Sequence, residues 1–498
     1  MLAGALAQVT LPADAQTWDI RPAISILETA TTNVDLAPPG SARDDLVTLI
    51  TPSLHVRERG AHTTFSGRVS VPVALYLDSG GNNDSAFPSA TLLGSVEVVD
   101  GFFYVDSSVS IAQQFFSPFG AQPLGFTNNT DNRYRTDTYR ITPYIRGVTP
   151  GNIAYELRNN NVWTHLSGSP VRTNDGYYTE WLGDASSRSP ATFGWSAHAE
   201  WTEYRYNDQR PTVMQLARLK AIYNVDPELQ LWVTGGYEDN QFVLTENRGA
   251  IYGAGFEWRP TPRTSVLGNY EHRFFGPSYK FSFSHRTPLS AWSVHVGRDI
   301  STFPRQLATL PAGVEIAGII DTLFLSSIPD PAERQRAVDE FIRDRGLTDV
   351  LSSPVPLYSQ QVILHETQSA TAGIIGARNS AFFTVFHVRS EPISGSGNPL
   401  PSPFAAGNNN SQTGANLIWT QRLTPTLALS TTLLGYRTVA NAPLEGTTRQ
   451  GAVRVVVSSP LSARTSVHAG ARYQILRSNI TTDYEEAAVF VGMSYEFR

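Results

Sequence analysis

Apolar and polar side chains alternate with a period of two along much of this chain. In residues 251–259, aromatic and small apolar side chains alternate with glycine and charged ones, and residues 268–274 and 467–475 repeat the pattern. Side chains on a β-strand point to opposite faces in turn, so each segment predicts a strand with one apolar and one polar face. A soluble β-sandwich would show the same alternation, so the number and connection of the strands must decide the fold.

The connections between these segments are short and long in turn. Turn-forming residues mark the short ones, at 100–101, 149–152, 226–228, 260–263, 287–289, 423–426 and 459–462. The long ones are polar and rich in Gly, Asn and Pro, at 78–88, 117–132, 167–176, 391–411 and 440–446. Transmembrane barrels have brief periplasmic turns and extended outer loops. The segments therefore predict an antiparallel transmembrane β-barrel of about 22 strands, within a range of roughly 18 to 24, over residues 16–498.

The final strand ends on aromatic residues. Its outward face would carry Val489, Val491, Met493, Tyr495 and Phe497, and the opposite face Gly492, Ser494 and Glu496. This pattern resembles the C-terminal signal of bacterial outer-membrane barrels, with Tyr495 and Phe497 as the insertion signal. The resemblance implies a location in the bacterial outer membrane, with outer-membrane lipid and the barrel-insertion machinery as partners.

Composition agrees with strands in lipid more than with membrane helices. Charged residues make up 16% of the chain, and no run of 18 apolar residues occurs. Aromatic residues and the 38 glycines suit strands, turns and interfacial belts. Cysteine is absent, which excludes disulfides, thiolate metal sites and a cysteine nucleophile. The net charge of -6 gives no attraction to nucleic acid, so no nucleic-acid partner is predicted.

Residues 1–15 resemble a truncated signal peptide. Ala13, Asp14 and Ala15 have the small-x-small form of a cleavage site, although a basic n-region is missing. An ordinary disordered tail is the alternative. Neither interpretation adds a membrane helix.

One long connection breaks the strand pattern. Residues 303–357 show helical spacing, first at 314–325 and again after Asp330, an N-cap residue followed by Pro331 and Glu333. The segment predicts a helical hairpin inserted in an outer loop. It would plug the lumen, cap the mouth, dock a partner or simply pack on the rim.

A family resemblance covers most of the chain. Residues 248–302 read RGAIYGAGFEWRPTPRTSVLGNYEHRFFGPSYKFSFSHRTPLSAWSVHVGRDIST, and RFFGPSY followed by SHRT is their most specific part. These residues, with WDIRP at 18–22, TTN at 31–33 and IPDPAE at 328–333, resemble outer-membrane barrels associated with the PEP-CTERM and exosortase protein-sorting system. Members accompany exopolysaccharide loci, so the resemblance implies a role in exporting or assembling extracellular polysaccharide or biofilm matrix, with polysaccharide and periplasmic export components as partners.

Motifs for catalysis and cofactors are not found. The chain lacks a phosphate-binding glycine loop and a dinucleotide fingerprint, and Gly253 and Gly255 are expected to relieve crowding inside the barrel. His272, His285 and His295 lie on adjacent predicted strands, but alternation does not put all three on one face. No enzyme activity, catalytic residue, cofactor or metal is therefore predicted.

Strand parity alone predicts which polar side chains face the lumen. The candidates are Asn269, Glu271, Arg273, Lys280, Arg286, Arg454, Arg472 and Glu496. They would either hydrate a passing solute or merely solvate the interior and pair across strands. The first functional hypothesis is a passive conduit or scaffold for exopolysaccharide export. The alternatives are a general porin for small hydrophilic solutes and a structural anchor for extracellular polymer.

Overall fold

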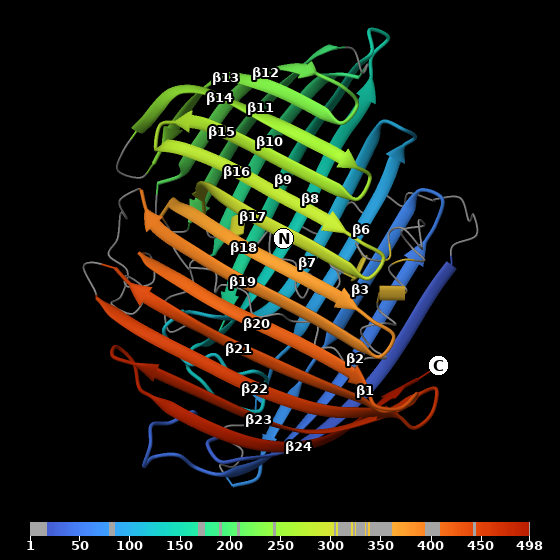
Figure 1. Cartoon of the computed structure of the whole chain (residues 1–498), viewed down its shortest axis with the longest axis vertical. Coiled ribbons are helices and arrows are strands. Elements are labelled where there is room, and N and C mark those ends of the chain that lie inside the picture. The colour runs from blue at the N-terminus through green and yellow to red at the C-terminus, as the bar shows by residue number, and fades with distance from the viewer. Residues whose placement is uncertain are drawn as a thin grey trace, which may run out of the picture.

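The chain forms one closed β-barrel (Figure 1). The computed structural model describes residues 17–78, 85–167, 175–188, 192–206, 210–242, 246–302, 305–306, 320–321, 324, 334, 337–338, 361–393, 409–441 and 445–497. Its strands are β1 (Thr17–Thr31), β2 (Asp45–Arg59), β3 (Thr63–Ser70), β4 (Val73–Tyr76), β5 (Ser85–Ala86), β6 (Ser89–Val99), β7 (Phe103–Phe115), β8 (Arg133–Val148), β9 (Ile153–Ser167), β10 (Gly176–Ser187), β11 (Phe193–Tyr206), β12 (Thr212–Asn224), β13 (Leu229–Gln241), β14 (Glu246–Thr261), β15 (Thr264–Arg273), β16 (Gly276–Arg286), β17 (Ser290–Ser301), β18 (Ile363–Ile375), β19 (Asn379–Pro392), β20 (Asn410–Arg422), β21 (Ala428–Ala440), β22 (Gly446–Pro460), β23 (Thr465–Ser478) and β24 (Tyr484–Glu496).

The barrel wall has 22 strands because two of the 24 segments continue a neighbour. β3 and β4 both pair with β2, one on each side of Val71 and Pro72, and β5 and β6 pair with them in turn. Proline lacks the N–H that a central strand needs, which explains an interruption at this position. The prediction of a closed antiparallel barrel of about 22 strands is confirmed.

The first and last strands close the barrel. β1 pairs antiparallel with β24, and Ile24 and Ile26 lie opposite Tyr495 and Met493. Both described chain ends lie at the end of the barrel that carries the short turns. The long connections lie at the other end, except that β15 and β16 are joined there by a tight turn in which Gly276 has φ +93°. Only glycine adopts such a backbone without strain.

The outer surface is an aliphatic band between two girdles of aromatic residues, as in transmembrane barrels. Exposed aromatic residues near the short-turn end include Trp18, Trp195, Tyr223, Trp258, Trp292, Trp419 and Phe497. Those nearer the other end include Tyr139, Trp163, Tyr237, Tyr252, Tyr270 and Tyr473. Between them, exposed aliphatic residues include Ile141, Leu157, Leu219, Val233, Leu433, Val455, Val489 and Val491. This surface places the barrel in the bacterial outer membrane.

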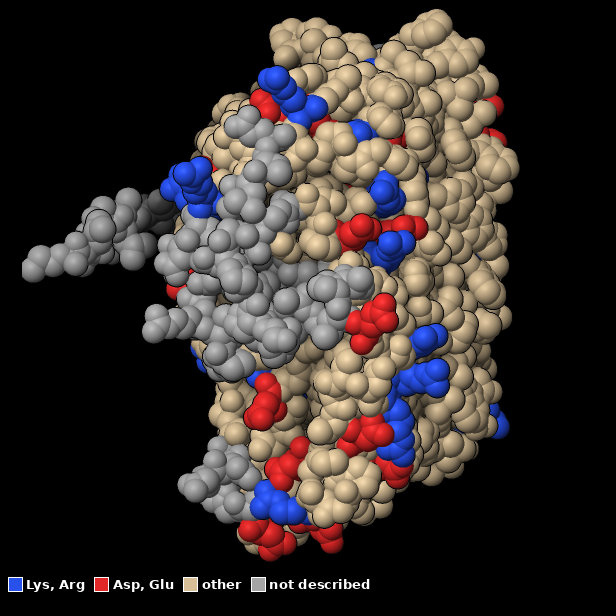
Figure 2. Space-filling model, turned by 90° about the vertical axis from the view of Figure 1, so that its left-hand side faces the viewer, with Lys and Arg blue, Asp and Glu red and all other residues tan. Residues whose placement is uncertain are grey.

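The end of the barrel with the long connections carries charged residues on its surface. Figure 2 shows basic and acidic side chains on this face, beside a flank with few charges. A charged rim suits water and headgroups, whereas a flank with few charges suits hydrocarbon.

The helical hairpin predicted for residues 303–357 is not supported. Most of this segment lies outside the described residues. The few described positions in it, such as Arg305 and Val338, have helical backbone, but the described part of the chain contains no helix that would support a hairpin. Among the described residues, no helix is long and apolar enough to cross a membrane. The signal peptide predicted for residues 1–15 also lies outside the described residues.

Candidate functional site

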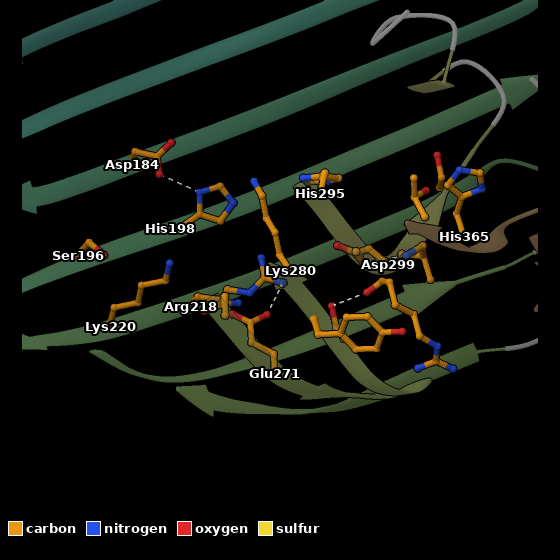
Figure 3. A pocket seen from close by; sticks show the side chains of 18 residues that line it. Asp184, Ser196, His198, Arg218, Lys220, Glu271, Lys280, His295, Asp299 and His365 are labelled. Carbon is orange, nitrogen blue, oxygen red and sulfur yellow. Dashed lines mark hydrogen bonds and ion pairs between the residues drawn. The ribbon is translucent and has the colours of Figure 1, made fainter. Parts of the chain in front are cut away.

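A polar cavity of about 590 Å³ lies inside the part of the wall formed by β10 to β18 (Figure 3). This volume is within the range of about 300–1,000 Å³ that small-molecule sites occupy. The charged side chains that reach it from the inner faces of β10–β12, β15 and β16 are Asp184, Arg218, Lys220, Glu271 and Lys280. The rest of the ionisable lining is His198, Tyr279, His295, Arg298, Asp299 and His365. We call this space the lumen cavity.

Strand register sets these side chains in a row around the inner wall. Asp184 lies opposite His198, and His198 lies opposite Arg218 on the next strand. Further along the wall, Glu271 lies opposite Ser278. Directly opposite residues in a sheet share a face, so each of these side chains points away from the lipid.

Glycines clear space on the inner wall between Arg218 and Glu271. Arg218 on β12 reaches past β13 and β14, and its Nη2 lies 3.0 Å from Oε2 of Glu271 on β15. Gly236 and Gly253 occupy the intervening positions, and a Cβ at Gly253 would lie 2.0 Å from the carbonyl oxygen of Tyr270. A side chain at this position would therefore collide with the neighbouring strand.

A second glycine in β14 makes room for a buried indole ring. A Cβ at Gly255 would lie 2.5 Å from two ring atoms of Trp232. The indole Nε1 donates a hydrogen bond of 2.9 Å to Oδ1 of Asn269, a cavity residue. Lys220 Nζ lies 5.3 Å from the centre of one Trp232 ring, within the range of a cation–π contact.

Each carboxylate in the cavity lining has a basic partner. The pairs are Asp184 with His198 at 2.8 Å, Glu271 with Arg218 at 3.0 Å, and Asp299 with Arg273 at 2.6 Å. Arg273 also donates to Glu238 at 2.6 Å, and that pair is almost completely buried. These pairs hold the wall together and leave the two lysines without a carboxylate partner among the described residues.

A cluster of buried apolar residues lies next to the cavity, toward the end with the long connections. It joins β9–β12 to β17 and β18 across the lumen through Val162, Tyr178, Tyr204, Tyr206, Met214, Phe242, Ile300, Val362 and Leu364. Ile300 belongs to both the cluster and the cavity lining. The cluster therefore narrows the lumen above the lumen cavity.

Arg305 makes a second link across this part of the lumen. It follows β17, and its Nη1 donates a hydrogen bond of 3.3 Å to Oε1 of Glu200 on β11. Burial by itself would lower the pKa of Arg305, but the Glu200 carboxylate raises it above its ordinary value. The guanidinium thus stays charged and ties Arg305 to β11.

Elsewhere in the lumen, two connections fold against β22–β24 and β1. Residues 32–44 and 116–132 meet where Asn129 donates from its backbone to Val34, and where the Asn128 side chain donates to the carbonyl of Asn33. Oδ1 of Asn128 accepts a hydrogen bond of 2.8 Å from Arg472 on β23. We call residues 116–132 the inner strap.

A buried ion pair anchors the inner strap to the wall. Arg472 Nη2 lies 2.8 Å from Oε1 of Glu486, and the side chains are 7% and 0% exposed. Glu486 also accepts hydrogen bonds from Thr31 on β1 at 2.7 Å and from Asn128 at 3.4 Å. Three separate parts of the chain therefore share one carboxylate.

The structure brings together some of the residues that strand parity selected. Asn269, Glu271 and Lys280 line the lumen cavity, and Arg273 borders it through Asp299. Arg454 and Arg472 lie apart from these, on β22 and β23; the Arg454 guanidinium is 5.0 Å from the Phe490 ring centre. Arg286 and Glu496 are the last residues of β16 and β24, at the short-turn end.

The predicted insertion signal lies at the barrel seam. The rings of Tyr495 and Phe497 meet edge to face with centres 4.9 Å apart, and Phe497 is exposed. The Phe497 N–H donates to the carbonyl of Pro22 on β1. The aromatic end of the chain is therefore fixed to the first strand.

The three histidines considered for a metal site do not come together. His272 stacks on Tyr252, which faces lipid, and His285 lies on the same face as Phe283 and contacts Thr264. Only His295 lines the lumen cavity. Within the described ranges, no group of three His, Asp or Glu side chains has the spacing to hold a metal ion.

One row of residues superficially resembles a catalytic triad. Nδ1 of His365 is 3.1 Å from Oγ of Ser390, and His365 lies opposite Asp299 on β17. However, Ser390 is fully buried, and Asp299 accepts hydrogen bonds from Arg273 and from its own neighbour Ile300. A buried hydroxyl offers no approach to a substrate, so we interpret the row as part of the wall.

Sequence reasoning missed several lumen residues. Asp184, His198, Lys220 and Glu486 show period-two alternation like the candidates, and extending the parity argument to β10–β12 and to the start of β24 would have found them. Asn128 carries no such signal, because it lies in a connection.

Comparisons with known proteins show the fold. No family model and no curated protein matches the chain. Among solved structures, it is similar to the FrpB iron transporter from Neisseria meningitidis (F5-1 variant), with TM-score 0.50 and 10% identity over 96% of this chain and 83% of that one. The siderophore receptor PirA from Acinetobacter baumannii gives 0.49 and 10%, over 97% and 81%. The outer membrane protein opdK from Pseudomonas aeruginosa gives 0.35 and 9%, over 96% and 99%. At such low identity, the similarity to FrpB establishes the barrel architecture alone.

Proposed function

We propose that this barrel is a passive conduit or scaffold for exopolysaccharide crossing the outer membrane. The observation that carries the proposal is the lumen cavity, a hydrophilic space on the inner wall in which every carboxylate is already paired. Such a wall offers hydroxyl, amide and imidazole groups to a hydrated chain, and its carboxylates are not free to repel an acidic one. The sequence resemblance to barrels of exopolysaccharide loci is the reason for proposing polysaccharide as the transported molecule. Transport would proceed by hydration and hydrogen bonding, with no bond made or broken and no cofactor.

Deletion of the gene tests this proposal. A conduit predicts that polysaccharide accumulates in the periplasm and falls outside the cell. Normal secretion with loosely attached polymer would contradict it and favour a structural anchor. Complementation with the unaltered gene controls for effects on neighbouring genes.

A general porin for small hydrophilic solutes is the second candidate. The mixed charges of the lumen favour it, because they would select only weakly among solutes. Conductance of the purified protein in planar bilayers, with and without residues 303–357, tests it. A steady open conductance and uptake of unrelated sugars would support the porin, whereas a closed barrel that still restores polysaccharide secretion would contradict it.

We also propose that the aromatic end of β24 is read by the barrel-insertion machinery. Replacing Phe497 with Ala removes the exposed terminal ring, and we expect less barrel in the outer membrane at equal synthesis. Replacing Leu461, an exposed apolar residue in a short turn, with Ala is the control. Equal loss in both variants would contradict the proposal.

A further inference from the structure

The chain has only two lysines, Lys220 and Lys280, and both line the lumen cavity. They come from β12 and β16, which lie four strands apart in the wall. Figure 3 shows their side chains around the same space, with His295 nearby. Every other basic side chain except histidine in the protein is an arginine. The single place where ammonium groups gather is thus inside the barrel.

These two ammonium groups have no counter-charge among the described residues, and Lys220 contacts only the Trp232 ring. Neither lysine forms an ion pair or hydrogen bond with a described residue, and the carboxylates that line the cavity are engaged elsewhere. The Nε atom of Arg218, buried beside them, also has no hydrogen-bond partner among the described residues. Although the whole chain carries a net charge of -6, this cavity therefore presents uncompensated positive charge. Such a space attracts anions.

The remaining lining supplies groups that bind hydroxyls. Ser196, Asn269 and Thr367 reach the cavity, and His295 has no hydrogen-bond partner in the described part of the chain. Oδ1 of Asn269 is held by Trp232, whereas its amide nitrogen has no partner there. An amide, hydroxyls and an imidazole around a hydrated space match the several hydroxyls of a sugar ring.

We propose that the lumen cavity binds an acidic sugar, with its carboxylate between Lys220 and Lys280 and its hydroxyls on the neutral polar lining. This inference deepens the proposed function and rests on it, because it names the chemical class of the cargo as a uronate-containing polysaccharide. The lysines act as point charges and tolerate a moving ligand, which a conduit requires. Charge-assisted hydrogen bonds to the carboxylate supply most of the selectivity against neutral sugars.

The scarcity of lysine makes the test direct. Reductive methylation with ¹³C-formaldehyde labels Lys220, Lys280 and the N-terminal amine of the full chain, and NMR in detergent reads the three methyl signals. Galacturonate is titrated against galactose, acetate and inorganic phosphate. We expect galacturonate to shift both lysine signals and leave the N-terminal signal unchanged, and galactose to shift neither.

Variants provide the controls. The double variant K220Q/K280Q should bind galacturonate at least about tenfold more weakly by calorimetry, which corresponds to about 1.4 kcal/mol. R464Q, which removes one charge from an exposed short turn, should bind as tightly as the unaltered protein. A single cooperative unfolding transition in urea, measured for the unaltered protein and for each variant, shows that all of them are folded.

Three results would overturn the inference: equal lysine shifts with galactose, stronger binding of acetate or phosphate than of galacturonate, or unchanged binding by K220Q/K280Q. The proposed function fails separately. If the protein binds galacturonate but gene deletion leaves polysaccharide secretion normal, the acidic-sugar site is supported and the conduit is contradicted. If gene deletion traps a neutral polymer in the periplasm, the conduit is supported and the acidic-sugar site is contradicted.

Discussion

Arg218 on β12 and Glu271 on β15 form an ion pair at 3.0 Å although two strands lie between them. The two side chains can meet across β13 and β14 because Gly236 and Gly253, which lie opposite Arg218 and Glu271, have no side chains that would block the contact. It cross-links the inner wall beside the lumen cavity, and it occupies the one carboxylate on β15 that would otherwise neutralise the nearby lysines. The glycines therefore influence the charge of the cavity as well as its shape.

Replacing Gly253 with Ala should destabilise the barrel. The new methyl group would meet the carbonyl of Tyr270 at 2.0 Å, so the strand must shift, at a cost of about 1–3 kcal/mol. The matched control is Gly235→Ala, since a Cβ there meets nothing within 4 Å. Urea unfolding followed by tryptophan fluorescence measures both. Equal stability of the two variants would show that β14 and β15 accommodate the methyl group.

Replacing Glu486 with Ala should destabilise the protein by about 3–5 kcal/mol, because Arg472 would remain buried without a counter-charge. Glu485→Ala is the control on the next residue. Glu485 pairs with Arg477, but both side chains are more than 40% exposed, so its loss should cost about 0–1 kcal/mol. The free energy of unfolding is the measurement. A similar loss in both variants would mean that the inner strap is not held by Glu486.

Replacing Arg305 with Ala should raise the single-channel conductance in planar bilayers. The substitution removes the hydrogen bond from Arg305 to Glu200 on β11 and shortens a side chain that lies inside the lumen. Arg205→Ala is the control, because Arg205 pairs with Glu203 at the barrel surface. Unchanged conductance in Arg305→Ala would show that this link does not restrict ion flow.

Replacing Leu433 with Arg should strongly impair the barrel, since Leu433 is exposed in the middle of β21. A charged side chain at the bilayer midplane costs about 2–4 kcal/mol, against about 0–1 kcal/mol near the interface. Val439→Arg places the charge near the interface, because Val439 lies on the same face of β21 as Leu433 and six residues nearer the outer end. The measurement is stability in lipid bilayers. Two equal penalties would contradict the position of the apolar band.

The wall of the barrel could be predicted from sequence because its signal is local. Period-two alternation needs only neighbouring residues, so the outward positions of Tyr252 and Trp258 follow from residues 251–259 alone. The turn residues and the long connections likewise mark their own positions. The number of strands follows by counting.

The interior could not be predicted in the same way, because its contacts join distant parts of the chain. Asn128 and Arg472 are 344 residues apart, and nothing near Asn128 distinguishes its segment from an ordinary polar loop. Strand alternation also predicts which side of the wall a side chain faces, but not its position along the barrel axis. It therefore grouped Arg286, at the short-turn end, with Lys280, which lines the lumen cavity.

The shared carboxylate of Glu486 links barrel closure to events inside the lumen. Thr31 and Glu486 are 455 residues apart and lie on the two strands whose pairing closes the barrel. Their hydrogen bond forms only when β24 has reached β1, so the inner strap has its complete docking surface only in a finished barrel. Full docking of the inner strap, residues 116–132, therefore requires a completed barrel. In a chain that has not yet added its last strand, the inner strap would lack this contact.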